Sequence, residues 1–475
     1  MGEDTPKSAP QELTRRKYMQ YAAAGIATAA VTGLGYYLTA LSSTQPQLAL
    51  TRTETSSLSL PAPTADFEYE PSYIKPTSAD TIHFLNKSQN PDGIETGLAY
   101  SWYVDDKMVA NTKDFSTQLS SDAIGTPHNV RLSACRADQC GDVEKVVEVD
   151  PDEIYPPTEL QVPLKSIVYD AGTQYKYEGW DNRRWLSEEQ FKRELVDVIN
   201  RELGCNAVRL TGTDHNYLFR VAEIAINQGH FDKILINPRF IDCTRDEVLD
   251  KIVEFARGAE DLRQRHNGIV FSIGNELAQD TKGIGSDLRF YQERAMDKWD
   301  TGWKDTLDDF LEDLSSAVSG VFNGELTYAA GYWELPIDWA GLGLNVISVN
   351  EYLDSGRPIA DMNRQLSELR AYADSRRKQL WITEFGCATF EGAFEIGGMA
   401  WAEKGKTYSQ EAQADGIKKY LQIFNEVQPE ACTLHQFWEW NEDDSTSFAI
   451  TKFRRSMPPQ RKLGFYVYKS YQRVS

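Results

Sequence analysis

The segment FSIGNELAQD, Phe271 to Asp280, starts as a buried strand and ends in polar side chains. Its first residues are apolar or small, and a glycine then leads into Asn275 and Glu276. Such a pair is common where a helix begins, because the Asn side chain caps the first turn and the acid complements the helix dipole. A functional interpretation of Glu276 therefore requires a second, matching carboxylate elsewhere in the chain.

Seven other apolar runs are similar to the one that precedes Asn275. In order, the eight runs are SIVYD, NAVRL, KILIN, GIVFSI, LTYAAG, NVISVN, LWITEF and TLHQFW. Between them, amphipathic patterns predict helices over residues 187–203, 244–264, 304–319, 360–376 and 409–426. Buried strands that alternate with helices predict an α/β fold, a (β/α)8 TIM barrel, over residues 160–475. A doubly wound open sheet is the structural alternative.

Polar residues stand where several of these runs end. In a barrel, chemistry lies at the carboxyl ends of the strands, so these residues are candidates for a functional site. Strands four and seven lie on nearly opposite walls of a ring of eight, and Glu276 and Glu384 are therefore predicted to converge across the barrel mouth. The candidates are Arg209 at the end of run two, Asn275 and Glu276 at the end of run four, Asn350 and Tyr352 at the end of run six, Glu384 at the end of run seven, and Trp438, Glu439 and Trp440 at the end of run eight.

The motifs SIGNEL and WITEFG resemble the signatures of the clan A glycoside hydrolases, and their glutamates lie 108 residues apart (384 minus 276). The resemblance covers about residues 163 to 470. It implies that Glu276 is the general acid and base and that Glu384 is the nucleophile. It also implies a set of residues around the bound sugar, here Arg209, Tyr352 and either Trp438 or Trp440.

Cleavage of a glycosidic bond requires a proton for the leaving oxygen and support for a positively charged sugar in the transition state. Two carboxyl groups supply both, with retention of configuration when one of them is the nucleophile. Glu276 must then start protonated, so we expect burial and the charge of Glu384 to raise its pKa. Arg209 and Tyr352 would keep Glu384 ionised, and Asn275 would hold the sugar 2-hydroxyl.

The resemblance implies β-linked oligosaccharides or polysaccharides as the partner, with β-mannan, β-glucan and a β-galactoside all open. The same two glutamates would perform transglycosylation if an acceptor sugar outcompeted water. A non-catalytic surface protein that binds glycans is the alternative from another class. The presence of both glutamates with Arg209, Asn275 and Tyr352 argues against it, because a binding protein needs no nucleophile.

Composition excludes other functions. The formal net charge of -21 over 475 residues argues against nucleic acid as a partner, because phosphate binding needs clustered Lys and Arg. The six histidines are scattered and no two cysteines form a CxxC unit, so we expect no metal site and no cofactor.

The N-terminal residues resemble a targeting segment rather than part of a folded domain. Residues 1–41 resemble a twin-arginine export signal, in which Arg15 and Arg16 precede about twenty weakly apolar residues. The run is also long enough to span a bilayer, so a cleaved signal and a retained membrane anchor are both open. Either interpretation places the protein outside the cytoplasm, in the extracellular space or at the cell surface. Residues 42–67 are rich in Ser, Thr, Pro and Gln and are predicted to be a flexible linker.

Residues 68–151 alternate apolar and polar side chains in short runs, which predicts a small all-β sandwich. The order SQNPDG, YSWYVDD and NVRLSACRADQC resembles a PKD-type immunoglobulin-like domain, although Asp105-Asp106-Lys107 replaces its usual Gly-Asp-Gly turn. Cys135 and Cys140 flank a hairpin-sized segment, and an exported protein meets oxidising conditions, so we predict that they form a disulfide. The other four cysteines are expected to be buried thiols.

Overall fold

The computed structural model describes residues 61–70, 73–74, 81–91, 97–119, 128–149, 155–175, 180–181, 186–284, 302–354, 357–398, 400, 403, 405–438, 445–452 and 459–473. The predicted export segment and most of the predicted linker lie outside these ranges. Within these ranges, no helix is both long enough and apolar enough to cross a membrane.

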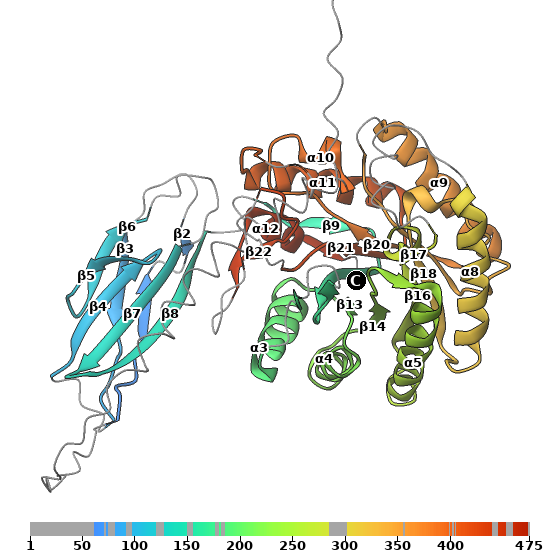
Figure 1. Ribbon diagram of the computed structural model, residues 1–475. Helices are drawn as coiled ribbons and strands as arrows, with labels where there is room; N and C mark the ends of the chain where they lie inside the picture. The colour runs from blue at the N-terminus through green and yellow to red at the C-terminus, as the bar shows by residue number, and fades with distance from the viewer. Residues whose placement is uncertain are drawn as a thin grey trace, which may run out of the picture. The chain divides into compact units, whose positions relative to one another are not determined.

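The N-terminal part of the described chain is a β sandwich (Figure 1). One sheet has the strand order β1-β3-β6 and the other the order β2-β8-β7-β4-β5. The strands are β1 (Phe67–Glu70), β2 (Tyr73–Ile74), β3 (Thr81–Asn86), β4 (Ala99–Val104), β5 (Lys107–Ala110), β6 (Phe115–Gln118), β7 (His128–Arg136) and β8 (Gln139–Val149).

Trp102 is at the centre of the sandwich core. Its ring lies 5.1 Å from Phe67, 5.9 Å from Phe84 and 5.0 Å from Phe115, measured between ring centroids. These partners come from the opposite sheet, so one aromatic cluster joins the two layers. The indole Nε1 donates to the carbonyl of Thr112 at 2.9 Å, which satisfies its only polar group. The predicted sandwich is confirmed, while its PKD-type family stays a prediction.

Two hairpins in this domain depend on short turns. Asp105 and Asp106 join β4 to β5 with positive φ angles of 49° and 66°, a conformation that Asp tolerates better than most residues. Cys135 and Cys140 are opposite each other in the β7–β8 ladder and form a disulfide. The other four cysteines are buried and free.

The C-terminal part is a closed barrel of eight parallel strands. The first strand, β10, pairs with the second, β13, and also with the last, β21, so the ring has no edge. This closure confirms the TIM barrel and excludes the open, doubly wound sheet. The strands are β10 (Leu164–Asp170), β13 (Ala207–Gly212), β14 (Lys233–Pro238), β16 (Ile269–Asn275), β18 (Glu325–Gly331), β19 (Val346–Asn350), β20 (Gln379–Phe385) and β21 (Ala431–Leu434).

Helices lie outside the barrel strands (Figure 1), and those that the sequence predicts are all present. The first begins as an α-helix capped by Ser187 and continues as a wider π-type helix. Two further helices, α4 and α12, were not predicted, although Asp214 caps α4 by accepting from the Tyr217 N–H at 2.9 Å. The helices are α3 (Glu188–Lys192) with η1 (Arg193–Glu202), α4 (His215–Gln228), α5 (Arg245–Arg263), α8 (Gly302–Ser319), α9 (Ile359–Arg376), α11 (Gln410–Val427) and α12 (Leu463–Ser470).

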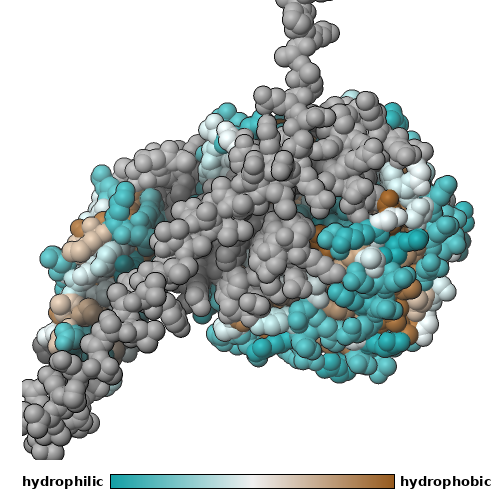
Figure 2. Space-filling model, viewed as in Figure 1, coloured by the Kyte–Doolittle hydropathy of each residue, from teal (hydrophilic) through white to brown (hydrophobic). Residues whose placement is uncertain are grey.

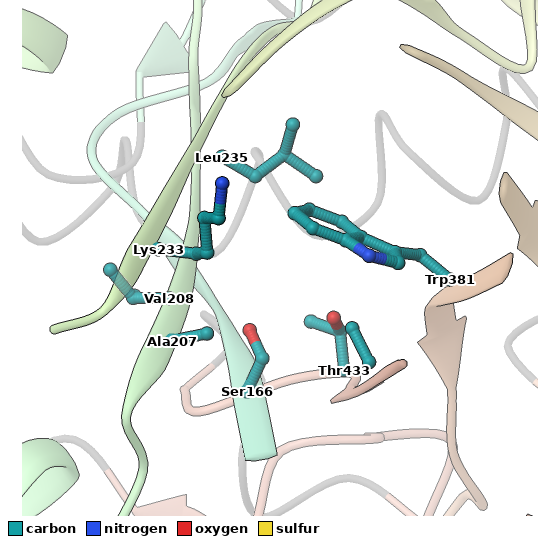
Figure 3. Close-up of a pocket in the computed structure, with 8 residues that line it drawn as sticks. Ser166, Ala207, Val208, Lys233, Leu235, Trp381 and Thr433 are labelled. Carbon is teal, nitrogen blue, oxygen red and sulfur yellow. The ribbon is translucent and has the colours of Figure 1, made fainter. Parts of the chain in front are cut away.

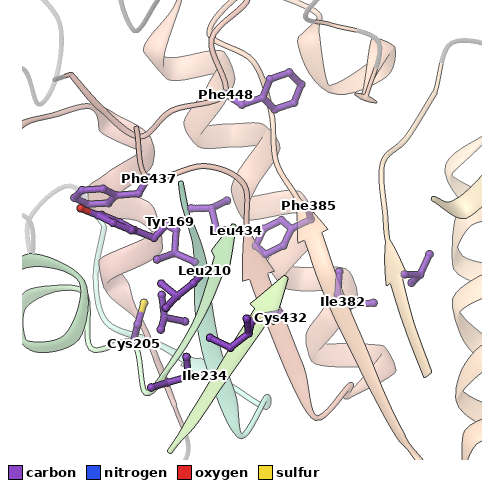
Figure 4. Packing of buried hydrophobic residues seen from close by; sticks show 14 of the residues in the cluster. Tyr169, Cys205, Leu210, Ile234, Ile382, Phe385, Cys432, Leu434, Phe437 and Phe448 are labelled. Atoms are coloured by element: carbon purple, nitrogen blue, oxygen red, sulfur yellow. The ribbon is translucent and has the colours of Figure 1, made fainter. Parts of the chain in front are cut away.

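Successive residues of each barrel strand alternate between two environments. In β13, Val208 and Leu210 join the large apolar cluster between strands and helices, part of which is shown in Figure 4. Inside the barrel, a small separate cluster that includes Leu235 and Trp381 fills the end where the strands begin. A cavity beside Trp381 (Figure 3) has a volume of about 10 Å³, enough for one water molecule at most. The amino ends of the strands are therefore packed, and this cavity is no substrate site.

The outer surface of the barrel domain is polar where the described residues can be seen. Figure 2 shows mainly hydrophilic side chains over α5 and α8, with apolar residues scattered among them. This is the pattern expected of amphipathic helices that bury one face against the strands.

Replacing Trp102 with Ala is expected to destabilise the sandwich by about 3–5 kcal/mol, because a buried aromatic side chain leaves a cavity. The adjacent Tyr103 is a matched control, because it is only partly buried. Its ring centroid lies 3.7 Å from the Arg131 guanidinium carbon, a cation–π contact. Tyr103→Ala should cost about 1 kcal/mol. Urea unfolding of the two variants measures the difference, and equal losses would contradict the assignment of Trp102 to the core.

Candidate active site

The predicted residues of strands two, four, six and seven meet in one buried network at the carboxyl end of the barrel. Arg209 belongs to β13, Asn275 ends β16, Asn350 ends β19 and Glu384 lies in β20. Glu276 follows directly after β16. All five side chains are buried, so their charges and hydrogen bonds must be matched within the site.

Arg209 links these strands through both terminal nitrogens of its guanidinium group. Nη2 lies 2.9 Å from Glu384 Oε1 and donates to Asn275 Oδ1 at 2.6 Å. Nη1 donates to the Thr383 carbonyl at 2.7 Å and to Asn350 Oδ1 at 3.2 Å. The side chain is only 1% exposed, and a buried charge requires a partner of opposite sign. Glu384 is that partner.

The amide of Asn350 connects the two glutamates. Its Nδ2 donates to Glu276 Oε1 at 3.0 Å. Its Oδ1 accepts from Arg209 and, at 2.9 Å, from Thr383 Oγ1. The partners of Nδ2 are hydrogen-bond acceptors and the partners of Oδ1 are donors, so the orientation of the amide is determined. Glu276 and Glu384 are therefore held in one site by a chain that runs through Asn350 and Arg209.

The backbone at Glu276 has a conformation that side chains rarely adopt, with φ 43° and ψ 49°. Two groups from β18 and the turn after it hold the residues that follow. Tyr328 Oη accepts from the Leu277 N–H, and Glu334 Oε1 accepts from the Ala278 N–H, both at 2.9 Å. Tyr328 Oη also donates to Glu334 Oε2 at 2.8 Å. This buried pair fixes the turn that carries Glu276.

The two glutamates have opposite protonation tendencies. Burial, followed by the negative charge of Glu384, raises the pKa of Glu276 from 4.5 to about 8, against the opposing effects of Arg239 and Asn350. Burial also acts to raise the pKa of Glu384, but the charge of Arg209 and, after it, the contact with His435 outweigh burial and hold this pKa well below 4.5. Near neutral pH the site therefore contains one carboxylic acid and one carboxylate.

Two side chains contact Oε2 of Glu384, the oxygen that Arg209 leaves free. Tyr352, which was predicted, donates from Oη at 3.2 Å. His435, which the sequence reasoning missed, places Nδ1 3.2 Å from the same oxygen. His435 follows β21 and lies inside the run TLHQFW, so a titratable side chain within that run was the signal that could have identified it.

Of the two predicted tryptophans, the structure describes Trp438. Trp438 is buried within the apolar cluster that surrounds the barrel, and its carbonyl accepts from Gln436 Nε2 at 2.5 Å. A role for Trp438 in sugar binding stays a prediction. Trp440 lies outside the described residues.

Arg239 is a further cation at the barrel mouth that the sequence reasoning missed. Its Nε lies 2.9 Å from Asp280 Oδ2, and Asp280 is buried. Burial raises the pKa of Asp280, whereas Arg239 opposes that shift. The Arg239 charge also lowers the pKa of both Glu276 and Glu384.

In the described part of the chain, no three metal-binding side chains gather at one point.

No protein-family model and no curated protein matches this chain. Among solved structures it is similar to the FMN-binding β-glucuronidase from Facaelibacterium prausnitzii L2-6, with 16% identity and a TM-score of 0.43 over 86% of this chain and 61% of that one. It is also similar to a GH113 β-1,4-mannanase, with 17% identity and a TM-score of 0.44 over 66% of this chain and 99% of that one. A third is a GH113 β-mannanase from Alicyclobacillus acidocaldarius in complex with ManMIm, with 14% identity and a TM-score of 0.43 over 65% and 96%. The chain thus spans less than two thirds of the β-glucuronidase, and function is inferred below from the side chains of the site.

Replacing Glu276 with Gln should make stability less dependent on pH. The pKa of Glu276 is higher in the folded protein than the ordinary 4.5, so its contribution to stability is complete below 4.5 and is lost as pH rises through about 8. As pH rises from about 5 to about 8, the free energy of unfolding of the wild type should fall by roughly 1–4 kcal/mol more than that of Glu276→Gln.

Urea unfolding at several pH values measures this difference. Glu189→Gln is the matched control, because Glu189 is exposed on the surface of α3 and its replacement should leave the pH dependence as in the wild type. Parallel pH curves for Glu276→Gln and the wild type would show that burial does not hold a proton on Glu276.

Proposed function

We propose that this protein is a retaining glycoside hydrolase that acts on β-linked glycans. The observation that carries the proposal is a pair of buried carboxyl groups, Glu276 and Glu384, joined by Asn350 and Arg209 and driven to opposite protonation states. Such a pair is what double displacement at an anomeric carbon requires.

In the first step, a Glu384 oxygen attacks the anomeric carbon and forms an ester bond to it. The bond from that carbon to the glycosidic oxygen breaks, and the departing oxygen takes the proton of Glu276. In the second step, Glu276, now a carboxylate, removes a proton from water, whose oxygen attacks the same carbon. The ester bond breaks and Glu384 leaves as a carboxylate, so configuration is retained after two inversions.

The partners of Glu384 support this cycle. Arg209 and Tyr352 donate to the carboxylate, which stabilises its charge before attack and again when it leaves. Asn275 uses its Oδ1 to accept from Arg209, while its buried Nδ2 donates to no described residue. A buried N–H group without a partner is costly, and a sugar hydroxyl in the site would accept from it. This agrees with the sequence-based expectation that Asn275 holds the 2-hydroxyl.

A protein that only binds glycans has no need for this charge separation. It costs stability to bury Glu276 next to an ionised Glu384, and that cost is understandable if the proton is used in catalysis. Transglycosylation shares the first step and differs only in the acceptor, so analysis of the products on a glycan substrate distinguishes it from hydrolysis.

The stereochemistry of azide rescue tests the two assigned roles against each other. Without the Glu384 carboxylate, azide attacks the sugar directly from the vacated face, so Glu384→Ala should form an α-glycosyl azide from an aryl β-glycoside. Without Glu276, the glycosyl-enzyme still forms and azide attacks it from the other face, so Glu276→Ala should form a β-glycosyl azide. Each variant is expected to lose about a thousandfold or more of its activity in the absence of azide.

Proton NMR of the products of a panel of aryl β-glycosides identifies the anomer and, together with β-mannan and β-glucan, the substrate class. Reversed anomers would exchange the two roles. Wild-type protein that binds glycans but releases no product from any substrate would contradict the proposed function.

The pH dependence of kcat/KM should have its alkaline limb near pH 8, because Glu276 must hold a proton in the free enzyme. In Glu384→Ala rescued by azide, this limb should move to lower pH. The reason is that the Glu384 charge is the second cause, after burial, of the raised pKa of Glu276. Initial rates with an aryl glycoside at a series of pH values measure both limbs, and an unshifted limb would mean that the two groups are not coupled.

A further inference from the structure

His435 occupies the position directly after β21, the eighth barrel strand. Its ring is near the rings of Tyr352 and Phe448, with centroids 6.4 and 5.7 Å away. The side chain is mostly buried, and no part of the mechanism above uses it. A buried imidazole that contacts the nucleophile is the titratable group of this site whose role is unassigned.

The partners of Nε2 determine that this nitrogen carries a proton. It lies 2.5 Å from Gln436 Oε1. The orientation of the Gln436 amide follows from its other end, where Nε2 donates to the Trp438 carbonyl at 2.5 Å. A carbonyl oxygen only accepts, so Gln436 presents its own oxygen to the imidazole, which must donate. His435 therefore has a proton on Nε2 in its neutral form as well as in its charged form.

The other ring nitrogen, Nδ1, belongs to a triangle of three polar atoms. It lies 2.9 Å from Tyr352 Oη and 3.2 Å from Glu384 Oε2, and these two oxygens are 3.2 Å apart. With a neutral imidazole the phenol supplies the only proton, so Nδ1 and the carboxylate face each other without one. With an imidazolium, Nδ1 donates to one oxygen and the phenol still donates to the carboxylate. An ionised Glu384 therefore favours a second proton on His435.

Two arginines near the triangle carry charges that oppose that proton. Arg209, on β13, binds the other carboxylate oxygen, Oε1, at 2.9 Å. Arg239, after β14, acts on Glu384 through its charge. Phe448 contributes an uncharged ring. Glu384, by contrast, contacts Nδ1 directly through Oε2.

We propose that His435 is a second cation on the nucleophile, protonated at both ring nitrogens while Glu384 is ionised and neutral when Glu384 carries no charge. The protonation itself follows from the contacts above, whereas its use in catalysis rests on the proposed function. When Glu384 becomes an ester, Nδ1 loses its anionic acceptor and releases the proton to solvent. When the ester breaks, the carboxylate charge returns and the proton returns with it.

The expected effect on catalysis lies mainly in the second step. A cation beside Oε2 reduces the nucleophilicity of Glu384 in the first step. In the second step, His435 takes a proton from solvent as charge develops on Glu384, and the imidazolium stabilises that charge. His435 would therefore promote departure of the nucleophile and make the two steps differ in their pH dependence.

Nitrogen NMR of the full chain labelled with 15N-histidine tests the protonation without any substrate. The chain has six histidines, and the signal that His435→Asn lacks identifies His435. His435→Gln serves for this purpose if the first variant does not fold. Glu384→Gln keeps the shape of the nucleophile without its charge and so represents the esterified state. The titration midpoint of His435 should fall by about one pH unit or more in Glu384→Gln.

Tyr352→Phe is the matched control, because it removes the phenol from the same triangle and leaves the carboxylate. Its His435 should keep both protons at about pH 6, as in the wild type. Equal midpoints in the wild type and Glu384→Gln, or a wild-type Nδ1 without a proton at that pH, would overturn the proposal.

The kinetic part is tested separately, on an aryl glycoside that the wild type hydrolyses. His435→Asn keeps a hydrogen-bond donor but removes the charge, so it should lower kcat more than kcat/KM and produce a burst of the aryl product. Equal losses in both constants, without a burst, would remove the catalytic role and leave the protonation intact. A wild type that turns over no substrate would contradict the proposed function and would not affect the NMR result.

Discussion

The ion pair between Arg209 and Glu384 is the interaction on which the site depends. Both groups are buried, and neither charge is tolerable there without the other. The guanidinium group also donates hydrogen bonds to two side-chain oxygens and one backbone carbonyl, which belong to three other strands. A planar group with donors in fixed directions can do this, whereas a lysine could not. The pair thus sets both the position and the ionisation of the nucleophile.

The proton on the opposing acid follows from the same pair. Because Arg209 keeps Glu384 ionised, the neighbouring buried Glu276 is kept neutral, and the two carboxyl groups acquire different roles from one arrangement. The strained backbone at Glu276 adds a local cost, which the buried Tyr328 and Glu334 side chains offset by satisfying the N–H groups that follow. Much of the polar network at the barrel mouth therefore fixes the position and the protonation of one carboxylic acid, Glu276.

The barrel provides this arrangement by packing its two ends differently. Where the strands begin, apolar side chains such as Leu235 and Trp381 fill the interior. Where they end, the interior is polar, and its hydrogen bonds run between strands rather than along them. Stability and chemistry are thus separated along the strand axis, which is the usual division in folds of this kind. The longer helices around the barrel bury their apolar faces against the strands.

Local pattern in the sequence was sufficient for the fold and for most of the side chains that meet at the barrel mouth. Eight apolar runs, five helical periodicities and an alternating N-terminal segment predicted the barrel and the sandwich, because each depends on neighbours a few residues apart. Polar residues that interrupt the ends of those runs predicted Arg209, Glu276 and Glu384 for the same reason. Helices α4 and α12 were not predicted, although Asp214 caps the first of them.

The tertiary structure alone decided which side chains touch. The contact of His435 with Glu384, the amide bridge of Asn350 and the place of Trp438 in the apolar layer depend on how strands far apart in the chain are registered in a closed ring. The opposite protonation of the two glutamates has the same origin, because a pKa depends on burial and on charges that come from other strands. Hydrophobic periodicity encodes which residues are buried, but the distances between them are set by the closure of the barrel.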